Sequence, residues 1–526
     1  MINTTFYNAG AGAGKTYTLT HLLADAIRKE HIRPDGVILT TFTDAAAAEF
    51  RERAKAVLYE KGMYDEALAL EQAKIGTVHS VALDFVKKFW YILGRAQDDN
   101  VMTDEDTKQL INRSLANIPT DEELDTLQKL AQELNITKRE NNLTVLNEDF
   151  WKDQLKTIID CVSLYGIDDL EPSIHFSKAY IDEIFTEDVM LDEDLMDQVL
   201  ASIKAVAEAE YDKKPNTTAK GRVDDIHKYL RLKQKSLFEI YYSFNVSKFG
   251  TKAFQAINGL EEVCQIHNCI CVSKLVGEKL KQCVDIIFSM AKRWMEQYSE
   301  YKRVHHLIDY NDMEILLEKL LAVDEVRKEI QAQYSHLFID EFQDSSPIQV
   351  RIFEQLSKLV QKTYAVGDPK QAIYDFRGAD TALTLSVIND IASEANGNKK
   401  AEPLADSRRS VPELVYVTNA VFIPAFKKTL APTHVHLKPV RESIGLPALR
   451  RWHVDGKDEN NRTASNARKA NQIMQGIQLI LKEDPSATPS DIAVLARNKS
   501  ILKDVEKSLT EQAKALEEGD GAGIVQ

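Results

Sequence analysis

Near the start of the chain, residues 9–16 read Ala9-Gly10-Ala11-Gly12-Ala13-Gly14-Lys15-Thr16. Side chains this small let successive backbone N–H groups turn toward one anionic ligand, and a helix predicted over 17–29 points its positive end at the same place. The apolar pair Phe6-Tyr7 comes first, as expected for a strand that ends in a phosphate-binding loop. Lys15 would then reach the β- and γ-phosphates of a nucleoside triphosphate, and Thr16 would place its hydroxyl on Mg²⁺. Ala9 stands where such loops usually have their first glycine.

A second segment with chemical meaning is Asp340-Glu341-Phe342-Gln343-Asp344, which follows the apolar run 337–339. Asp340 suits a magnesium ligand, and Glu341 beside it can polarise an attacking water. Acidic pairs of this kind are often surface loops, but the apolar run before this one indicates a buried strand. The two segments together predict a chain that binds ATP with Mg²⁺ and hydrolyses it.

Composition limits the class of protein. The 526 residues are 44% hydrophobic, which predicts a globular chain of two to four domains. With 66 basic and 81 acidic residues the net charge is −15, which argues against nucleic-acid binding over the whole surface but leaves room for a local basic track. No apolar run approaches the roughly 18 residues of a membrane span, and residues 1–8 do not resemble a secretory signal. Five cysteines make no disulfide framework, so we expect a cytoplasmic protein without a membrane partner.

Short apolar runs alternate with helical stretches at both ends of the chain. The run 37–42 precedes an alanine-rich helical stretch at 44–55, and the runs 337–339 and 364–366 each end in a charged loop. This pattern is typical of buried parallel strands whose carboxyl ends carry the site. Between about 95 and 305 the pattern is almost wholly helical.

A second α/β segment begins near residue 400. Strands are predicted at 446–454 and 491–496, and the helix between them has an apolar face at helical spacing formed by Ile473, Ile477, Ile480 and Leu481. We therefore predict an α/β, P-loop NTPase fold with parallel sheets, a large all-α insertion in the first domain and a partial second domain. The predicted boundaries are 1–95 and 305–399 for the first domain, 96–304 for the insertion and 400–526 for the second domain.

Four further segments extend this interpretation. They are ILTTFTDAAAAE at 38–49, IGTVHS at 75–80, IDYND at 308–312 and VGDPKQAIYDFRGAD at 366–380. With the phosphate loop and the acidic segment, their order resembles the motifs of the UvrD/Rep-like superfamily 1A DNA helicases over about residues 4–415. The Pro-Lys-Gln form of the last segment is more similar to the RecB/AddA branch. The resemblance implies two RecA-like domains.

The resemblance also implies residue roles. Gln371 would sense the γ-phosphate and couple its state to DNA, and Arg409, within LADSRRS at 404–410, would be an arginine finger. Arg408 stands where the family usually has an aromatic residue that stacks on adenine. The implied catalytic residues are Lys15, Asp340, Glu341, Gln371 and Arg409, with Ala9, Gly10, Ala11, Gly12, Ala13, Gly14, Lys15, Thr16 and Arg409 on ATP and Thr16 and Asp340 on Mg²⁺. The implied DNA contacts are Thr41, Phe42, His79, Tyr374, Phe376 and Arg377; by residue type alone Phe42 could instead be a core residue that closes its strand.

By this resemblance the chain is an ATP-dependent 3′→5′ translocase and helicase that acts on single-stranded DNA and on single/double-strand junctions in repair or recombination. The resemblance also allows a protein partner such as a nuclease subunit. The alternative is a non-unwinding, ATP-binding subunit of a repair or defence complex that senses DNA. A P-loop kinase is disfavoured because it would not need the base-stacking segments. The family's upstream glutamine motif and its motifs V and VI are not found, so we expect a C-terminally incomplete helicase.

A basic stretch between residues 213 and 235 has two possible interpretations. Its cations could be a phosphate track for DNA, with aromatic residues interleaved for stacking, or one solvated helix face. The residues are Lys213, Lys214, Lys220, Arg222, Lys228, Arg231, Lys233 and Lys235, with Tyr229, Phe238, Tyr241 and Tyr242 among them.

Overall fold

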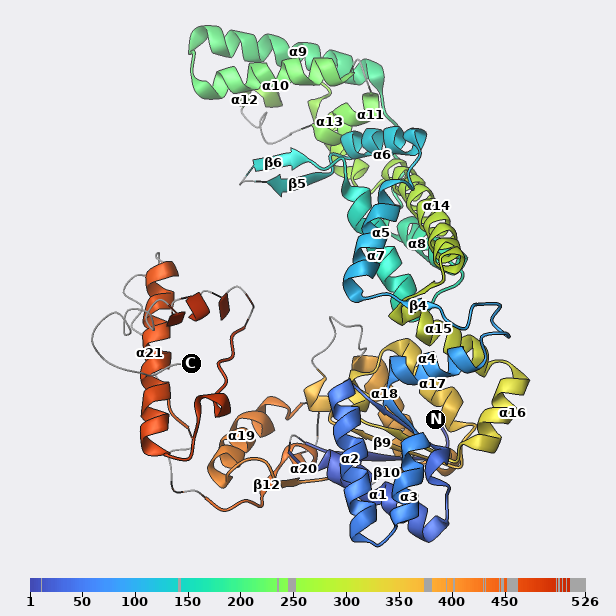
Figure 1. Ribbon diagram of the computed structural model, residues 1–526. Helices are drawn as coiled ribbons and strands as arrows, with labels where there is room; N and C mark the ends of the chain where they lie inside the picture. The colour runs from blue at the N-terminus through green and yellow to red at the C-terminus, as the bar shows by residue number, and fades with distance from the viewer. Residues whose placement is uncertain are drawn as a thin grey trace. The chain divides into compact units, whose positions relative to one another are not determined.

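The computed structural model in Figure 1 describes residues 1–10, 12–140, 143–233, 236–244, 252–372, 381–393, 395–400, 403–428, 430, 432–443, 445, 449–451, 462–497, 499, 502, 503, 505–507, 509 and 510. The chain divides into two compact units. The first comprises 1–7 and 16–401, and the second comprises 8–15 and 402–526. The four-part domain division given above stays a prediction.

The first unit is built on a six-stranded sheet with the order β10-β1-β9-β8-β2-β3. Parallel pairing joins β1 to β10, β9 to β8, β8 to β2 and β2 to β3. The strands are β1 (Thr4–Asn8), β2 (Val37–Thr41), β3 (Lys74–Thr77), β8 (His336–Ile339), β9 (Lys362–Gly367) and β10 (Lys399–Lys400). The predicted strands near 6–7, 37–42, 337–339 and 364–366 are confirmed, and so is the parallel α/β class.

Burial explains why these runs are strands. All five residues of β2 and all four of β8 are buried, because helices cover both faces of a parallel sheet. A strand buried on both faces reads as a continuous apolar run rather than as an alternation of apolar and polar residues. These continuous apolar runs are what allowed the strands to be predicted from the sequence.

Helices return the chain from one parallel strand to the next. The predicted helices at 17–29 and 44–55 are confirmed as parts of α1 and α2. The helices of this part of the unit are α1 (Lys15–Glu30), α2 (Asp44–Glu60), α3 (Tyr64–Ala69), α4 (Val78–Lys88), α15 (Tyr310–Leu321), α16 (Asp324–Gln333), α17 (Pro347–Ser357) and α18 (Thr381–Ala392), with short 3-10 turns at η1 (Pro34–Gly36), η2 (Leu70–Gln72), η4 (Phe342–Asp344), η5 (Pro369–Gln371) and η7 (Ala395–Gly397).

Hydroxyl side chains begin the helices that leave the carboxyl ends of the strands. The Thr43 hydroxyl accepts from the Ala46 amide at the start of α2, and the Thr77 hydroxyl accepts from the Ser80 amide at the start of α4. Ser346 and Gln349 form a reciprocal capping box at the start of α17. The first turns of these helices are thereby fixed at the edge of the sheet where functional residues are expected.

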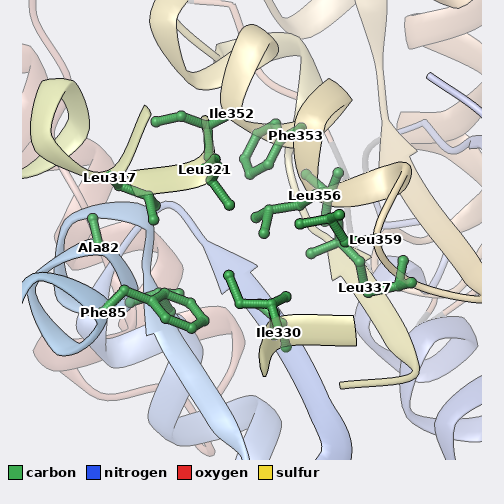
Figure 2. Close-up of a cluster of buried hydrophobic side chains, with 14 of the residues drawn as sticks. Ala82, Phe85, Leu317, Leu321, Ile330, Leu337, Ile352, Phe353, Leu356 and Leu359 are labelled. Carbon is green, nitrogen blue, oxygen red and sulfur yellow. The ribbon is translucent and has the colours of Figure 1, made fainter. Parts of the chain in front are cut away.

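One apolar core holds the helices against the sheet. Figure 2 shows its side chains converging from α4, α15, α16, α17 and β8. The Phe85 ring meets the Tyr334 ring edge-on, with 5.7 Å between the centroids, and both residues are buried. The strand ends therefore rest on a closely packed layer.

Residues 100–308 leave this core and return beside their starting point. Parallel pairing of β4 (Asn100–Val101) with β7 (Leu307–Ile308) brings the two ends together. The chain between them is helical except for the antiparallel hairpin of β5 (Thr137–Glu140) and β6 (Leu143–Leu146). Its helices are α5 (Asp104–Ala116), α6 (Asp121–Glu133), α7 (Phe150–Tyr165), α8 (Glu171–Ile184), α9 (Glu193–Lys213), α10 (Thr217–Lys233), α11 (Leu237–Ser243), α12 (Lys252–Gln255), α13 (Leu260–Ile270) and α14 (Lys274–Val304). We call α5–α14 with this hairpin the helical segment.

In the second unit the described residues form two short strands and three helices up to Glu483, and further helical residues lie within 499–510. The strands and helices are β11 (Asp406–Ser407), β12 (Lys438–Pro439), α19 (Pro412–Ala425), α20 (Pro432–Val435) and α21 (Arg462–Glu483), with the turn η8 (Pro489–Asp491). The helix predicted around Ile473 and Leu481 is confirmed as α21. The strand predicted at 491–496 is wrong: residues 492–496 pair with no other described strand, and Leu495 is 93% exposed. The strand predicted at 446–454 lies mostly outside the described residues.

A membrane-spanning helix needs a certain length and hydropathy. Across the described part of the chain, no helix combines the length and the hydropathy that crossing a bilayer would require.

We predict that Phe85→Ala lowers the free energy of unfolding of the first unit by about 3–5 kcal/mol, because the cavity left among packed side chains cannot collapse fully. Leu68→Ala is the control, since Leu68 is 65% exposed and its loss should cost under about 0.5 kcal/mol. Urea unfolding followed by circular dichroism measures both. Equal midpoints for the two variants would contradict this account of the core.

Candidate functional site

The loop 8–15 follows β1 and leads into α1. Gly12 has φ +72° and Gly14 has φ +83°, a backbone region in which a side chain is strained. The Ala13 amide donates to the Gly10 carbonyl over 3.1 Å, which closes a tight turn. Ala9 is fully buried, so the methyl group at the place of the usual first glycine is accommodated. The loop geometry thus fits a phosphate cradle, although Ala11 lies outside the described residues.

The same unit brings the predicted arginine segment to this loop. The Leu404 amide donates to the Asn8 carbonyl over 2.8 Å, and the Arg408 amide donates to the Gly12 carbonyl over 2.9 Å. A Cβ added to Gly12 would lie 2.6 Å from the Cβ of Arg409. The absence of a side chain at Gly12 is therefore what allows the Arg409 backbone to pack against the loop.

Within the first unit, the acidic segment begins where β8 ends. The Asp340 amide donates to the Thr40 carbonyl of β2 over 2.9 Å, so the sheet ladder continues up to the first acid. Glu341 turns away from the strand with φ +50°, a left-handed conformation that is uncommon for a residue with a side chain. Its amide donates to Asp340 Oδ1 over 3.0 Å, a local bond that supports this turn. The chain therefore turns sharply directly after Asp340.

A buried glutamine links this acidic segment to the end of β9. Gln343 Nε2 donates to Glu341 Oε2 over 2.8 Å and to Asp344 Oδ2 over 3.1 Å. Gln343 Oε1 accepts from the Asp368 amide over 2.8 Å, and a Cβ on Gly367 would come within 2.8 Å of that oxygen. The amide group thus uses both of its N–H groups and its oxygen, which fixes its orientation.

Asp368 extends this network to the predicted γ-phosphate sensor. Gln371 Nε2 donates to Asp368 Oδ2 over 2.6 Å, and Lys370 Nζ lies 2.7 Å from Asp368 Oδ1. Gln343 and Asp368 are each only 1% exposed. A continuous chain of hydrogen bonds therefore connects Glu341 to Gln371. We call the residues Glu341, Gln343, Asp368 and Gln371 the acid–sensor network.

Sequence reasoning missed Gln343 and Asp368 as functional candidates. Gln343 lies in the acidic segment 340–344 and Asp368 in the segment 366–380. Neither residue type at these positions indicates a functional role from the sequence alone. Their signal is structural, because both side chains are buried and need partners. The Gln343 oxygen finds one in the Asp368 backbone amide, and the Asp368 carboxylate finds its partners in Gln371 and Lys370.

A pocket of about 510 Å³ lies at the carboxyl ends of β2 and β3. Phe42 is half-buried and lines it, so this ring is not enclosed in the core. Asp344, which shares the Gln343 amide with Glu341, lines the pocket as well. Its lining residues are Thr41, Phe42, Thr77, Val78, His79, Asp104, Ser163, Leu164, Tyr310, Asn311, Glu314, Asp344, Ser346 and Gln349. We call it the edge pocket.

His79 is the cationic candidate of the edge pocket. Its Nε2 lies 3.1 Å from Glu314 Oε1, and its ring centroid lies 5.0 Å from that of Tyr310. Burial lowers the pKa of His79, but the Glu314 carboxylate, with Asp104 and Asp44 farther away, outweighs burial and raises the pKa overall. His79 therefore keeps its proton to a higher pH than an isolated imidazole.

The structure describes only some of the remaining predicted site residues. Tyr374, Phe376 and Arg377 lie outside the described residues, so their implied DNA contacts remain predictions. Thr16 stands in the first turn of α1, directly after Lys15.

Two aromatic residues of the basic stretch, Tyr229 and Tyr241, are core residues. Tyr229 and Tyr241 are 3% and 0% exposed in the core of the helical segment, where they cannot stack on bases. Arg222 pairs with Glu210 over 2.6 Å. The interleaved-stacking interpretation is therefore wrong for these rings, while Lys220 and Lys228 are exposed.

The chain is similar to known proteins over most of its length. Residues 3–392 match the family described as UvrD/REP helicase N-terminal domain. Similar proteins are also found among those named as a subunit of an ATP-dependent helicase/nuclease. The one from Ligilactobacillus salivarius is 24% identical over 79% of this chain and 37% of that protein, and the one from Syntrophomonas wolfei is 24% identical over 96% and 42%. The one from Lactobacillus helveticus is 23% identical over 95% of this chain and 46% of that protein.

The chain thus spans less than half the length of these curated relatives. The family match covers the loop at 9–16, the edge pocket and the acid–sensor network. It extends over well more than half of the 526 residues, and the chain belongs to the UvrD/REP helicase family.

Proposed function

We propose that this chain is an ATP-dependent DNA helicase or translocase that couples ATP hydrolysis to movement along single-stranded DNA. The observation that carries the proposal is the Gln343 amide, which bonds both to Glu341, the candidate for water activation, and to Asp344 of the edge pocket. Any movement of one carboxylate changes the hydrogen bonding of the other. One side chain thus offers a direct route between a hydrolytic acid and a nucleic-acid pocket.

For the nucleotide, we assign Lys15 to the β- and γ-phosphates of ATP and Gln371 to sensing the γ-phosphate. Asp340 and Thr16 would hold Mg²⁺, which would neutralise charge on the phosphates when bound. Glu341 would take the proton of the attacking water, and Arg409 would stabilise the charge that develops on the phosphate. The glycine geometry of the loop and the position of Asp340 at a strand end suit these roles.

For DNA, we assign the edge pocket to the unpaired strand. Phe42 and Tyr310 offer aromatic faces, on which any base can stack. Asn311 offers hydrogen bonds to phosphate and sugar, which position a strand without reading its sequence. Thr41 is assigned to the same path, and its hydroxyl now donates to the Thr43 carbonyl over 2.9 Å. His79, whose pKa the Glu314 carboxylate raises, adds an imidazole N–H group to the lining of the same pocket.

The 3′→5′ direction and the action at single/double-strand junctions rest on the family resemblance. The relatives are named as one subunit of a helicase/nuclease, which supports a role in repair or recombination together with a nuclease partner. The domain boundaries 1–95, 96–304, 305–399 and 400–526 belong to the same proposal.

Streptavidin displacement from biotinylated oligonucleotides tests the proposed function. The protein that carries this chain, supplied with ATP and Mg²⁺, should displace streptavidin from the 5′ end faster than from the 3′ end, as a 3′→5′ translocase must. ATP hydrolysis that DNA stimulates without any displacement would favour the alternative of a non-unwinding DNA-sensing subunit.

We predict that Lys15→Ala removes most ATP affinity, because the loop loses its cation, whereas Glu341→Gln keeps ATP affinity and loses turnover, because an amide cannot take a proton. Binding of a fluorescent ATP analogue and phosphate release measure the two effects. Lys29→Ala, at the other end of α1, is the control and should match the wild type. Equal loss of ATP affinity in the Lys15 and Glu341 variants would refute the assignment.

We predict that Gln343→Leu abolishes the stimulation of ATP hydrolysis by oligo-dT while the basal rate falls less. Leucine fills the space but offers no hydrogen bonds to Glu341, Asp344 or the Asp368 amide. Asn398→Leu is a matched control: Asn398 is also a buried amide, and it bonds to the Thr4 amide and the Met1 carbonyl. Both variants should lose about 1–3 kcal/mol of stability, but only Gln343→Leu should lose the stimulation. If oligo-dT still stimulates ATP hydrolysis by Gln343→Leu, Gln343 does not couple hydrolysis to DNA binding.

We predict that Phe42→Ala weakens oligo-dT binding by about 1–3 kcal/mol without changing its salt dependence, because stacking releases no counterions. Fluorescence anisotropy at several salt concentrations measures this. Tyr59→Ala is the control, since Tyr59 is an exposed aromatic residue of α2 that does not line the pocket. Wild-type affinity in Phe42→Ala would mean that DNA does not enter the edge pocket.

A further inference from the structure

A buried lysine stands near the end of the longest helix of the helical segment. Lys302, in the last turn of α14, is only 5% exposed. Its Nζ lies 2.7 Å from Asp309 Oδ2 and 2.7 Å from Asp312 Oδ1, and 4.3 Å from the centroid of the Tyr298 ring. A buried cation is stable only when it is paired in this way.

The two acids that Lys302 holds also form the start of α15. Asp309 Oδ1 accepts from the Asp312 amide over 2.8 Å, and Asp312 Oδ2 accepts from the Asp309 amide over 3.0 Å, which makes a reciprocal capping box. Burial, with the neighbouring charge of Asp309, raises the pKa of Asp312, while Lys302 opposes the shift. The ammonium group therefore keeps two carboxylates together that would otherwise repel each other.

The residues between and beyond these acids line the edge pocket. Tyr310 and Asn311 lie within the capped turn, and Glu314, which pairs with His79, lies one turn farther along α15. Successive helical residues project about 100° apart, so one side of this turn holds Lys302 while the other meets the pocket. Lys302 itself does not line the pocket.

We propose that Lys302 is a positioning residue for single-stranded DNA, which sets the first turn of α15 and thereby the place of Tyr310, Asn311 and Glu314 in the edge pocket. This rests on the proposed function, because it takes that pocket as the path of the strand. It also makes the helical segment a working part of the DNA site, since α14 runs through that segment and ends at this cluster.

The test is the affinity of the full-length chain for a fluorescent oligo-dT, with Lys302→Met as the variant. Methionine is an unbranched side chain one atom shorter than lysine, and it removes the charge. We expect binding to weaken about threefold to thirtyfold, the range typical of residues that act through others. The slope of affinity against salt should stay that of the wild type, because Lys302 touches no phosphate. A slope lowered by about one would mean direct phosphate contact and would overturn the proposal.

The same helix offers a matched control. Lys279, also on α14, pairs with Glu133 over 2.5 Å, and its Nζ lies 4.7 Å from the centroid of the Phe238 ring. Lys279→Met removes a comparable ion pair far along the chain from the pocket-lining turn. It should unfold at lower urea concentration yet bind oligo-dT like the wild type. An equal loss of affinity in both lysine variants would show general destabilisation and would overturn the positioning role.

Charge rescue separates positioning from folding. Adding Asp312→Asn to Lys302→Met removes one of the two carboxylates left without their cation, while the asparagine oxygen can still accept from the Asp309 amide. Most of the lost affinity should return. If Lys302→Met is folded and binds like the wild type, or if the double variant binds no better than the single one, the proposal is wrong.

Phe42→Ala in the same titration distinguishes a failure of the proposed function from a failure of the role of Lys302. If Phe42→Ala also binds like the wild type, the strand does not use the edge pocket, and the proposed function has failed. If Phe42→Ala weakens binding and Lys302→Met does not, only the role of Lys302 has failed.

Discussion

The parallel register of β8 between β2 and β9 is the constraint on which the candidate sites of the first unit depend. Backbone pairing sets Ile339 opposite Thr40 on one side and Ala365 on the other, so three chain segments end at one edge. At that edge the backbone hydrogen bonds between strands end, and side chains make the hydrogen bonds instead. Thr41 is the last residue of β2, and Asp340 and Asp368 directly follow β8 and β9. A register slip of one residue would turn each strand's buried side chains to the opposite face.

Polar groups at this edge are buried in pairs rather than singly. Gln343 accepts from the Asp368 backbone amide while the Asp368 carboxylate accepts from Gln371, and Lys302 with Asp309 and Asp312 forms a second set. Such sets are costly to break because each partner left behind stays buried without its bond. They therefore resist small displacements and move as units, which suits elements that must pass a change of position from one site to another.

The sequence predicted the strands, the phosphate loop and the acidic segment because each is local. An apolar run followed by an acid, or glycines before Lys15, can be recognised within ten residues. The pairing of His79 with Glu314 and of Lys302 with Asp309 could not be predicted, because these contacts depend on how helices pack. The strand predicted at 491–496 failed since an apolar run becomes a strand only beside another strand. The roles at Phe42 and Gln371 came from family resemblance, and the structure adds what surrounds them.

The position of β1 within the sheet has a consequence for biosynthesis. β1 lies between β9 and β10, which begin at residues 362 and 399 and which the ribosome adds at roughly 5–20 residues per second. For tens of seconds the first strand and its phosphate loop have no partners, while the helical segment, with its own cores, can already form. Until β9 and β10 emerge, nascent chains of this protein therefore carry Phe6 and Tyr7 of β1 without their sheet partners. Chaperones that bind extended segments with exposed aromatic residues should recognise this chain at β1.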